Sequence, residues 1–173
     1  NLVLAGNFNM TNVDELFQQL VDLGQHPKRK VDTVTILEKI GHFLDESNDD
    51  IYYKHKDKFS KKEITKIIED ELDVQDILTQ SAKYWDGGYV MCGLMGHGDA
   101  FALRDPNAIR PAYYYKDDEI VVVASERSVI QTSFDVNIED VKEIKAGHAL
   151  IIKKDGRVDE KQVKEPLERK SCS

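Results

Sequence analysis

Cysteine is scarce in this sequence: only two of its 173 residues are cysteines, Cys92 inside an apolar stretch and Cys172 near the end. Two cysteines without metal-ligand spacing cannot build a disulfide framework or a zinc site. His97 and His148 also lack a carboxylate or a second histidine at ligand spacing. We therefore expect a cytoplasmic protein, in a reducing compartment, whose chain holds no metal and no cofactor of its own.

Long apolar runs are missing too, because no stretch approaches the roughly 20 residues that a membrane-spanning helix needs. Positive charge is in the minority, with 24 Lys and Arg against 32 Asp and Glu and a formal net charge of -8. Since nucleic-acid affinity comes mainly from clustered Lys and Arg, this balance argues against a nucleic-acid partner. The length fits one domain. The sequence thus predicts a soluble single-domain chain without a membrane or nucleic-acid partner.

An initiator Met and a signal-type segment are both absent at the start of the sequence. The first apolar residues, 2–5, have the character of the middle of a strand. The last residues, 168–173, contain no closing helix. We therefore expect the chain to be an internal piece of a longer protein.

Helical periodicity dominates the first half of the sequence, after a short apolar run at residues 2–6 that predicts a strand. Ser60 and Glu63 have the spacing of a capping box. The strongly charged stretch 45–62 is predicted to be exposed, either as a loop or as an extension of the second helix. Apolar residues spaced i, i+3, i+4 and i+7 predict four helices, at about residues 13–20, 32–44, 64–72 and 74–85.

Short β-branched and apolar runs between turn residues dominate the second half. They predict antiparallel strands at residues 89–94, 100–103, 112–115, 120–124, 149–152 and 157–161. A set of helices followed by a set of strands, with little alternation, is typical of an α+β layered domain. The same pattern does not fit a doubly wound parallel sheet.

The polar segment at residues 6–12, predicted as a loop between a strand and a helix, is the first place that could carry chemistry. Its amide side chains and backbone N–H groups could bind an anion or an oxyanion. Turn and helix-cap chemistry explains the same composition, because Asn and Thr favour such loops. Composition alone favours the second interpretation.

Two further places combine charge with a defined position. Asp32, at the predicted start of the second helix, could hold a substrate's ammonium or amide group, although a simple helix cap is the more economical interpretation. Arg104 and Arg110 flank an Asp-Pro-Asn turn and could clamp a phosphate or a carboxylate. An ion pair between Asp105 and one of these arginines, which would brace a hairpin, is the simpler alternative.

Taken together, these segments resemble the amidophosphoribosyltransferase family of class II glutamine amidotransferases, in the same order along most of the chain. Residues 7–12, Asn-Phe-Asn-Met-Thr-Asn, resemble the family's Asn-Gly-Asn-Leu-Thr-Asn signature, and Asp32 and the following Thr resemble its Ser-Asp-Thr-Glu helix start. Residues 104–111, Arg-Asp-Pro-Asn-Ala-Ile-Arg-Pro, resemble its Arg-Asp-Pro-Asn-Gly-Ile-Arg-Pro block. Residues 124–126 and 144–149 are similar to segments that close the family's glutaminase domain.

The resemblance implies the αββα four-layer sandwich of N-terminal-nucleophile hydrolases, partial in this chain, with a helical insertion around residues 45–85. It implies a glutamine amidotransferase type 2 domain at residues 1–165 and the start of a linker at 166–173, before a phosphoribosyltransferase domain that the chain does not contain. A sandwich without its first strands would expose a sheet edge, so we expect low stability or association.

In this family an N-terminal Cys attacks glutamine, and the ammonia released converts phosphoribosyl pyrophosphate to phosphoribosylamine in the first step of de novo purine synthesis. The resemblance assigns the oxyanion hole to the side chain of Asn7 and the backbone N–H of Phe8. It assigns the substrate's α-ammonium to Asp32. Phe8 stands where the family has Gly, which could matter for a backbone angle closed to Phe. Since the family's nucleophile lies upstream, we expect this chain alone to be inactive.

The same resemblance suggests partners and cofactors. Glutamine and phosphoribosyl pyrophosphate are the expected substrates, Mg²⁺ would serve the absent domain, and the parent enzyme is expected to be a homo-oligomer. Cys172 falls where some members have an iron–sulfur ligand and cluster-free members can also have Cys. Two alternatives stay open: the glutaminase domain of another class II amidotransferase, of the glucosamine-phosphate synthase type, and a degenerate, non-catalytic regulatory module.

Overall fold

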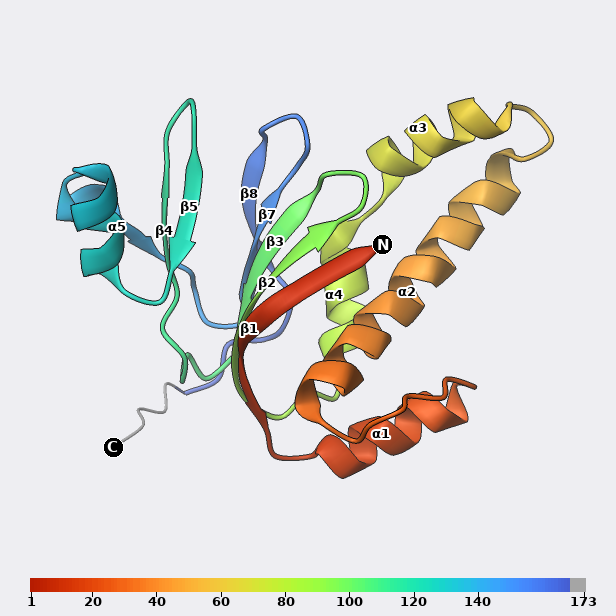
Figure 1. Ribbon diagram of the computed structural model, residues 1–173, viewed down its shortest axis with the longest axis horizontal. Coiled ribbons are helices and arrows are strands. Elements are labelled where there is room, and N and C mark those ends of the chain that lie inside the picture. Colours follow the sequence, from red (N-terminus) through yellow and green to blue (C-terminus); the bar gives the residue numbers. More distant parts are fainter. Residues whose placement is uncertain (169–173) are drawn as a thin grey trace.

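The computed structural model describes residues 1–168, which form layers of helices and sheets (Figure 1). The helices are α1 (Val13–Asp22), α2 (Asp32–His55), α3 (Lys61–Glu71), α4 (Val74–Ala82) and α5 (Arg127–Phe134). The strands are β1 (Leu2–Met10), β2 (Gly87–Met95), β3 (Ala100–Arg104), β4 (Tyr113–Lys116), β5 (Val121–Ala124), β6 (Lys142–Glu143), β7 (His148–Ile152) and β8 (Val158–Gln162). A short 3-10 helix, η1 (Ile138–Asp140), precedes β6. None of the described helices is long and apolar enough to span a membrane.

All strand pairs are antiparallel and form two sheets. The larger sheet has the order β1-β2-β3-β7-β8, and the smaller has the order β5-β4-β6. β1 therefore lies at an edge of the larger sheet, and β5 at an edge of the smaller one. β1 pairs with β2 over its whole length, from Leu2 opposite Met95 to Met10 opposite Gly87.

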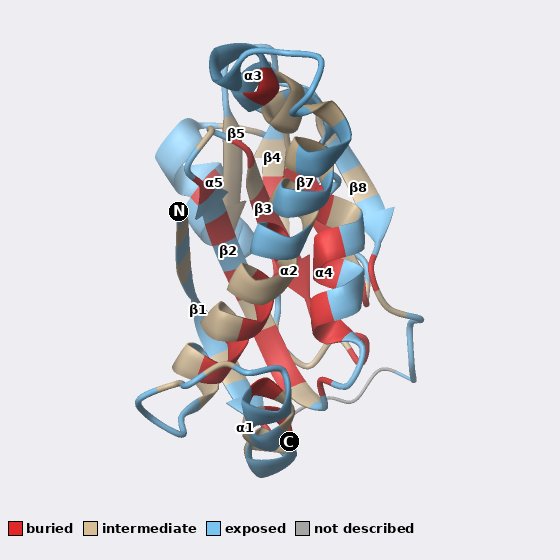
Figure 2. Cartoon of the chain, turned by 90° about the vertical axis from the view of Figure 1, so that its right-hand side faces the viewer, coloured by how far each residue is buried: buried red, intermediate tan, exposed pale blue. Residues whose placement is uncertain are grey.

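Helices α1, α2 and α4 cover one face of the larger sheet (Figures 1 and 2). Because side chains alternate along a strand, every second residue of β2 and β3 points to this face. The buried side chains of this core come from both layers: Leu16, Ile36, Ile40, Ile77, Leu78, Trp85, Tyr89, Met91, Met95, Phe101 and Leu103. This packing holds the N-terminus of α2 beside the end of β1.

The other face of the larger sheet packs against the smaller sheet. The core between the sheets contains Ala102, Ala112, Tyr114, Ile144 and Leu150. Helix α5 packs on β4 and β5 from the outside, where the guanidinium of Arg127 lies 4.9 Å from the ring centroid of Tyr113. The layers thus run helices, sheet, sheet, helix. This order confirms the predicted α+β class and the αββα sandwich.

The structure corrects the predicted loop at residues 6–12. Residues 6–10 continue β1, and only Thr11 and Asn12 form a turn. Glycine and asparagine are poor strand formers, but pairing with β2 along its full length outweighs this local preference. The residues proposed for the oxyanion hole therefore lie in a strand, not in a loop.

Two other elements were decided by packing as well. α2 continues to His55, so the helix-extension alternative is right for the first part of the charged stretch. α5 was not predicted, because Ile130 is its single buried residue and leaves no apolar stripe.

The capping box of Ser60 and Glu63 at the start of α3 is confirmed, with hydrogen bonds in both directions.

Candidate functional site

The free edge of β1 carries the candidate site. Two backbone hydrogen bonds set the direction of its N–H groups: Gly96 donates to the carbonyl of Asn1 at 2.8 Å, and Thr11 donates to the carbonyl of Asp86 at 2.9 Å. Hydrogen-bonded and non-hydrogen-bonded pairs alternate in an antiparallel ladder. Odd-numbered residues of β1 therefore bond to β2, and even-numbered residues direct their N–H groups away from it. The N–H of Phe8 consequently faces the open edge.

Asp32 lies at the same edge. Its Oδ2 accepts a hydrogen bond from the backbone N–H of Met10 at 2.9 Å, which ties the first residue of α2 to the last residue of β1. The residue at the N-cap position is Val31, and no side-chain capping bond forms there. Asp32 is thus not a simple cap. Within residues 1–168 its Oδ1 has no hydrogen-bond partner, so a second acceptor is available beside the helix N-terminus.

The turn between β1 and α1 is clamped to the turn that precedes β2. The Thr11 hydroxyl donates to the Asp86 carboxylate. The Asn12 side chain donates to the carbonyl of Tyr84 at 2.9 Å and accepts from the N–H of Asp86 at 3.3 Å. Thr11 and Asn12 therefore hold the site in place and are not free for a ligand. Sequence reasoning missed Asp86, whose only signal is its position in an Asp-Gly-Gly turn.

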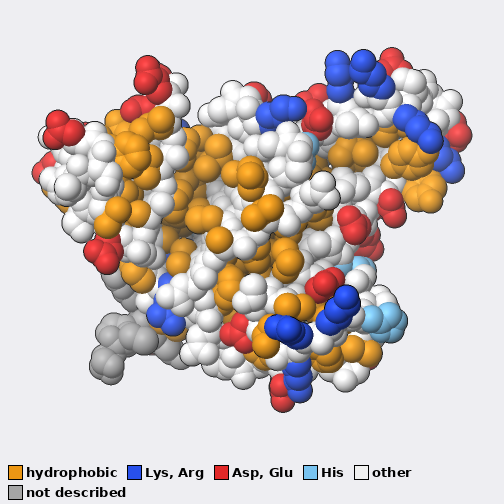
Figure 3. Space-filling model, viewed as in Figure 1, with side chains coloured by type: hydrophobic (Ala, Val, Ile, Leu, Met, Phe, Trp, Pro, Cys, Tyr) orange, Lys and Arg blue, Asp and Glu red, His pale blue; other side chains and the backbone are white. Residues whose placement is uncertain are grey.

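Asn7 points to the face opposite the helices. It pairs with Val90, and strand alternation puts it on the side that the smaller sheet partly covers. Its side-chain amide is exposed and makes no hydrogen bond within the described chain. Nearby, a cleft of about 190 Å³ opens between β1–β2 and the end of β5, lined by Ala5, Gly6, Val90, Met91, Cys92, Pro111, Val123, Ala124 and Ser125. Figure 3 shows apolar side chains along this face.

Phe8 requires no unusual backbone angle. Among residues 1–168, the only non-glycine residues with positive φ are Ala108, at 52°, and Asp135, at 51°. The Phe8 side chain packs against the core under the helices, which leaves its N–H on the open edge. The residue that differs from the family pattern and has a strained backbone is instead Ala108, which stands where the family has Gly.

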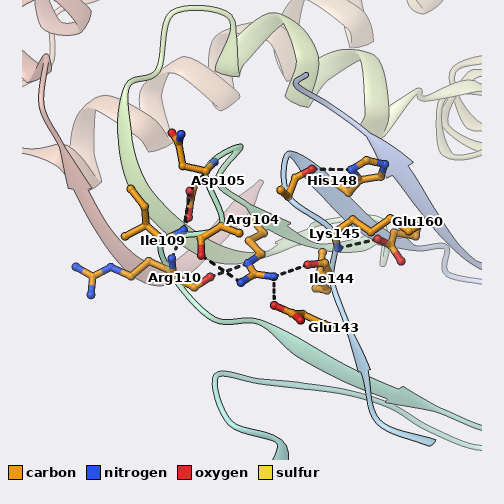
Figure 4. A network of polar contacts seen from close by, with 12 residues as sticks. Arg104, Asp105, Ile109, Arg110, Glu143, Ile144, Lys145, His148 and Glu160 are labelled. Carbon is orange, nitrogen blue, oxygen red and sulfur yellow. Dashed lines mark hydrogen bonds and ion pairs between the residues drawn. The ribbon is translucent and has the colours of Figure 1, made fainter. Parts of the chain in front are cut away.

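Residues 104–111 form a braced loop (Figure 4). Asp105 is fully buried, and its carboxylate accepts the backbone N–H groups of Asn107, Ile109 and Arg110, each at 3.0 Å. These three bonds close the turn around the carboxylate. Among the described contacts none is an ion pair between Asp105 and an arginine, so the ion pair suggested by the sequence is wrong.

Arg104 braces the same loop from the other side. Its guanidinium is buried and donates to the carbonyls of Arg110 and Ile144, both at 2.7 Å, and to that of Ala108 at 3.3 Å. It also pairs with the Glu143 carboxylate at 2.7 Å. Figure 4 shows the Arg110 side chain extending away from this guanidinium. The two arginines are therefore not arranged to clamp one anion.

The cysteines supply no nucleophile to this site. Cys92 lies in an exposed position of β2, but its thiol is partly buried, and this burial raises its pKa. A thiol with a raised pKa is a weak nucleophile at neutral pH, because the thiolate is the reactive form. Cys172, the candidate iron–sulfur ligand, lies outside the described residues.

Comparison with known proteins identifies similar chains. The family Glutamine amidotransferases class-II matches residues 58–171. The amidophosphoribosyltransferase of Pasteurella multocida (strain Pm70) is 29% identical over 162 residues, which cover 91% of this chain and 28% of that protein. A glutamine phosphoribosylpyrophosphate amidotransferase from B. subtilis, solved in complex with ADP and GMP, matches with a TM-score of 0.66 and 24% identity over 99% of this chain and 31% of its own.

A solved structure of the allosteric regulatory enzyme of purine biosynthesis matches in the same way, with a TM-score of 0.65 and 24% identity, over 99% of this chain and 30% of its own. The chain thus spans less than a third of the length of these relatives. At this identity the structural matches establish the fold. The family match covers most of the chain, and the layer order agrees with it. The chain belongs to the class II glutamine amidotransferases.

Proposed function

We propose that this chain is part of the glutaminase domain of a cytoplasmic amidophosphoribosyltransferase. The parent enzyme would hydrolyse glutamine and use the ammonia to convert phosphoribosyl pyrophosphate to phosphoribosylamine. The similarity to the Pasteurella multocida enzyme along 91% of the chain supports this assignment. The observation that carries it is the free edge of β1, where an unpaired N–H and a half-free carboxylate lie on one side of the strand.

Three groups of this chain would act on glutamine. The Asn7 amide and the Phe8 N–H would donate to the oxyanion of the tetrahedral intermediate, and Asp32 Oδ1 would accept from the α-ammonium. The N–H groups of Phe8 and Met10 are two residues apart on one edge, roughly 7 Å along a strand. Asp32 is bound to the N–H of Met10. The distance from the Phe8 N–H, which would donate to the oxyanion, to Asp32, which would accept from the ammonium, is therefore similar to the length of an extended glutamine.

The nucleophile would come from the parent protein. Cys92 is the sole cysteine in residues 1–168, and its raised pKa makes it unsuitable. The isolated chain should therefore release no ammonia from glutamine above the background rate. Ammonia release that disappears in a Cys92→Ser variant would overturn this part of the proposal.

Substitutions in the parent enzyme test the site. Asn7→Ala should lower glutamine-dependent kcat by about 10²- to 10³-fold, because one oxyanion donor is lost. Activity with free ammonium should remain, since that reaction bypasses the oxyanion hole. Equal loss with both nitrogen sources would mean that the domain is misfolded or that Asn7 has another role.

Asp32→Asn should mainly raise KM for glutamine. The matched control is Asp45→Asn, an exposed aspartate on the same helix, which should leave KM unchanged. An unchanged KM in Asp32→Asn would remove Asp32 from the site.

A non-catalytic glutamine-binding module is the second candidate, favoured by the open-edge N–H of Phe8 and the free Oδ1 of Asp32, which can bind glutamine without a nucleophile. Calorimetric titration of the isolated chain with glutamine distinguishes the two. Binding that Asp32→Asn abolishes, in a parent protein with no glutaminase activity, would support the module.

A further inference from the structure

One end of the molecule is strongly basic although the chain as a whole is acidic. Residues 54–66, at the tip of the hairpin formed by α2 and α3, contain six lysines and two acidic residues. All six lysines are exposed: Lys54, Lys56, Lys58, Lys61, Lys62 and Lys66. The formal net charge of the whole chain is -8. We call residues 54–66 the basic end.

Most charges of the basic end are unpaired. Lys54 forms an ion pair with Glu71 at 3.0 Å, and the ammonium of Lys56 lies 4.7 Å from the ring centroid of Tyr53. The other four lysines of the basic end form no ion pair within residues 1–168. Two aromatic side chains accompany them, Tyr53 at 61% exposure and Phe59 at 43%. The tip therefore combines free positive charge with exposed apolar surface.

The opposite end of the molecule is strongly acidic. Residues 117–140, which include the turn between β4 and β5, helix α5 and η1, contain seven acidic residues and one arginine. All seven are exposed: Asp117, Asp118, Glu119, Glu126, Asp135, Glu139 and Asp140. Exposed apolar side chains accompany them too, with Val129 at 51% and Phe134 at 44%. We call residues 117–140 the acidic end.

The two ends lie at opposite extremes of the long axis. In Figure 1, α5 and the β4–β5 turn stand at one side, and the α2–α3 tip stands at the other. Figure 3 shows lysines over the tip of α3 and acidic side chains over the opposite end. The two surfaces cannot meet within one molecule, but each can face the other surface on a second copy.

We propose that copies of this chain associate head to tail, with the basic end of one copy on the acidic end of the next. Both surfaces pair charge with exposed aromatic or aliphatic side chains, so ion pairs could surround apolar contacts. A nucleic acid or an anionic membrane would use the basic end only, and the acidic remainder of the molecule would repel it. A heterologous contact of this kind leaves one free end of each type, so it extends into open chains unless it closes into a ring.

The contact should depend on salt. Exposed ion pairs are individually weak and are screened within about 8 Å at physiological ionic strength. Sedimentation velocity should show association that increases with protein concentration. Raising the salt from low to above physiological strength should weaken it by about tenfold.

Two variants isolate the ends. The triple substitution Lys58→Glu, Lys62→Glu and Lys66→Glu removes the net positive charge of the basic end. The triple substitution Asp118→Lys, Glu119→Lys and Glu139→Lys removes the net negative charge of the acidic end. Each variant alone should be monomeric at concentrations at which the wild type associates. An equimolar mixture should form dimers and stop there, because each pair contains one working basic end and one working acidic end.

A matched control changes the same charge elsewhere. Lys28→Glu, Arg29→Glu and Lys30→Glu lie in the connection between α1 and α2 and should associate as the wild type does. Circular dichroism verifies the fold of each variant. A monomeric wild type, a mixture without dimers, or association that persists in both variants and ignores salt would overturn the proposal. A monomeric wild type that binds RNA or phosphatidylserine vesicles through the basic end would overturn it as well.

Discussion

Replacing Ala108 by glycine is expected to stabilise the protein. Ala108 has a φ of 52°, and the left-handed conformation costs an L-residue about 1–2 kcal/mol. Glycine loses more backbone freedom on folding, which offsets about 0.5–1 kcal/mol of that gain. The free energy of unfolding should therefore rise by about 0.5–1 kcal/mol, or roughly 1–4 °C in Tm for a domain of this size.

The loop has little opportunity to relax the strain. The N–H of Ala108 donates to the Asp105 carbonyl at 3.2 Å, and its carbonyl accepts from Arg104 at 3.3 Å. Both neighbouring residues donate their N–H groups to the Asp105 carboxylate. Urea unfolding followed by circular dichroism measures the change. The control Ala100→Gly, in β3 at an ordinary φ, should lose about 0.5–1 kcal/mol. If Ala108→Gly were also less stable than the wild type, the strain argument would be refuted.

Three further perturbations test other parts of the structure. Asp105→Ala leaves one buried and two partly buried N–H groups without an acceptor and should lower the free energy of unfolding by about 3 kcal/mol; a loss under about 1 kcal/mol in urea unfolding would contradict the bracing role. Burial opposes ionisation of Asp99, but the Lys153 ammonium, the neighbouring His97 ring and the backbone N–H of Lys154 hold its pKa below the usual value for an aspartate. Its contribution to stability is thus present above that value and is lost as the pH falls through the folded pKa. Asp99→Asn should flatten the pH dependence of the urea midpoint below about pH 4, and an unchanged slope would exclude Asp99 as its source. Val3→Lys, on the exposed edge strand β1, should reduce any aggregation that survives high salt, measured by light scattering; equal aggregation in this variant would show that the edge of β1 is not the aggregating surface.

Local patterns were sufficient for most elements. Apolar spacing predicted α1, α3, α4 and the start of α2, because a helix buries one stripe that recurs every three to four residues. Short β-branched runs between turn residues predicted the later strands in the right order, except for the two-residue strand β6, which is too short to leave a pattern. The capping box at Ser60 follows from two side chains three residues apart, so it needs no tertiary information.

Distant partners decided what the sequence could not. Residues 6–10 have weak strand propensity and become a strand because β2, far along the chain, pairs with them. Helix α5 buries little of its own surface and depends on the smaller sheet. The end of α2 within the charged stretch could not be predicted, because solvated side chains leave no periodic pattern.

The candidate site also depends partly on local sequence motifs and partly on contacts between distant segments. The sequence by itself determined which residues are candidates for chemistry or bracing, because Asn7, Asp32 and Arg104 stand in recognisable motifs. Only the tertiary structure decided what each group faces: Asp32 binds the Met10 N–H, the Phe8 N–H points to an open edge, and Arg104 donates to the Ile144 carbonyl, 40 residues away. The physical reason is that a motif sets residue types through local spacing, whereas a hydrogen-bond partner is set by strand register and packing between segments that are distant in the chain.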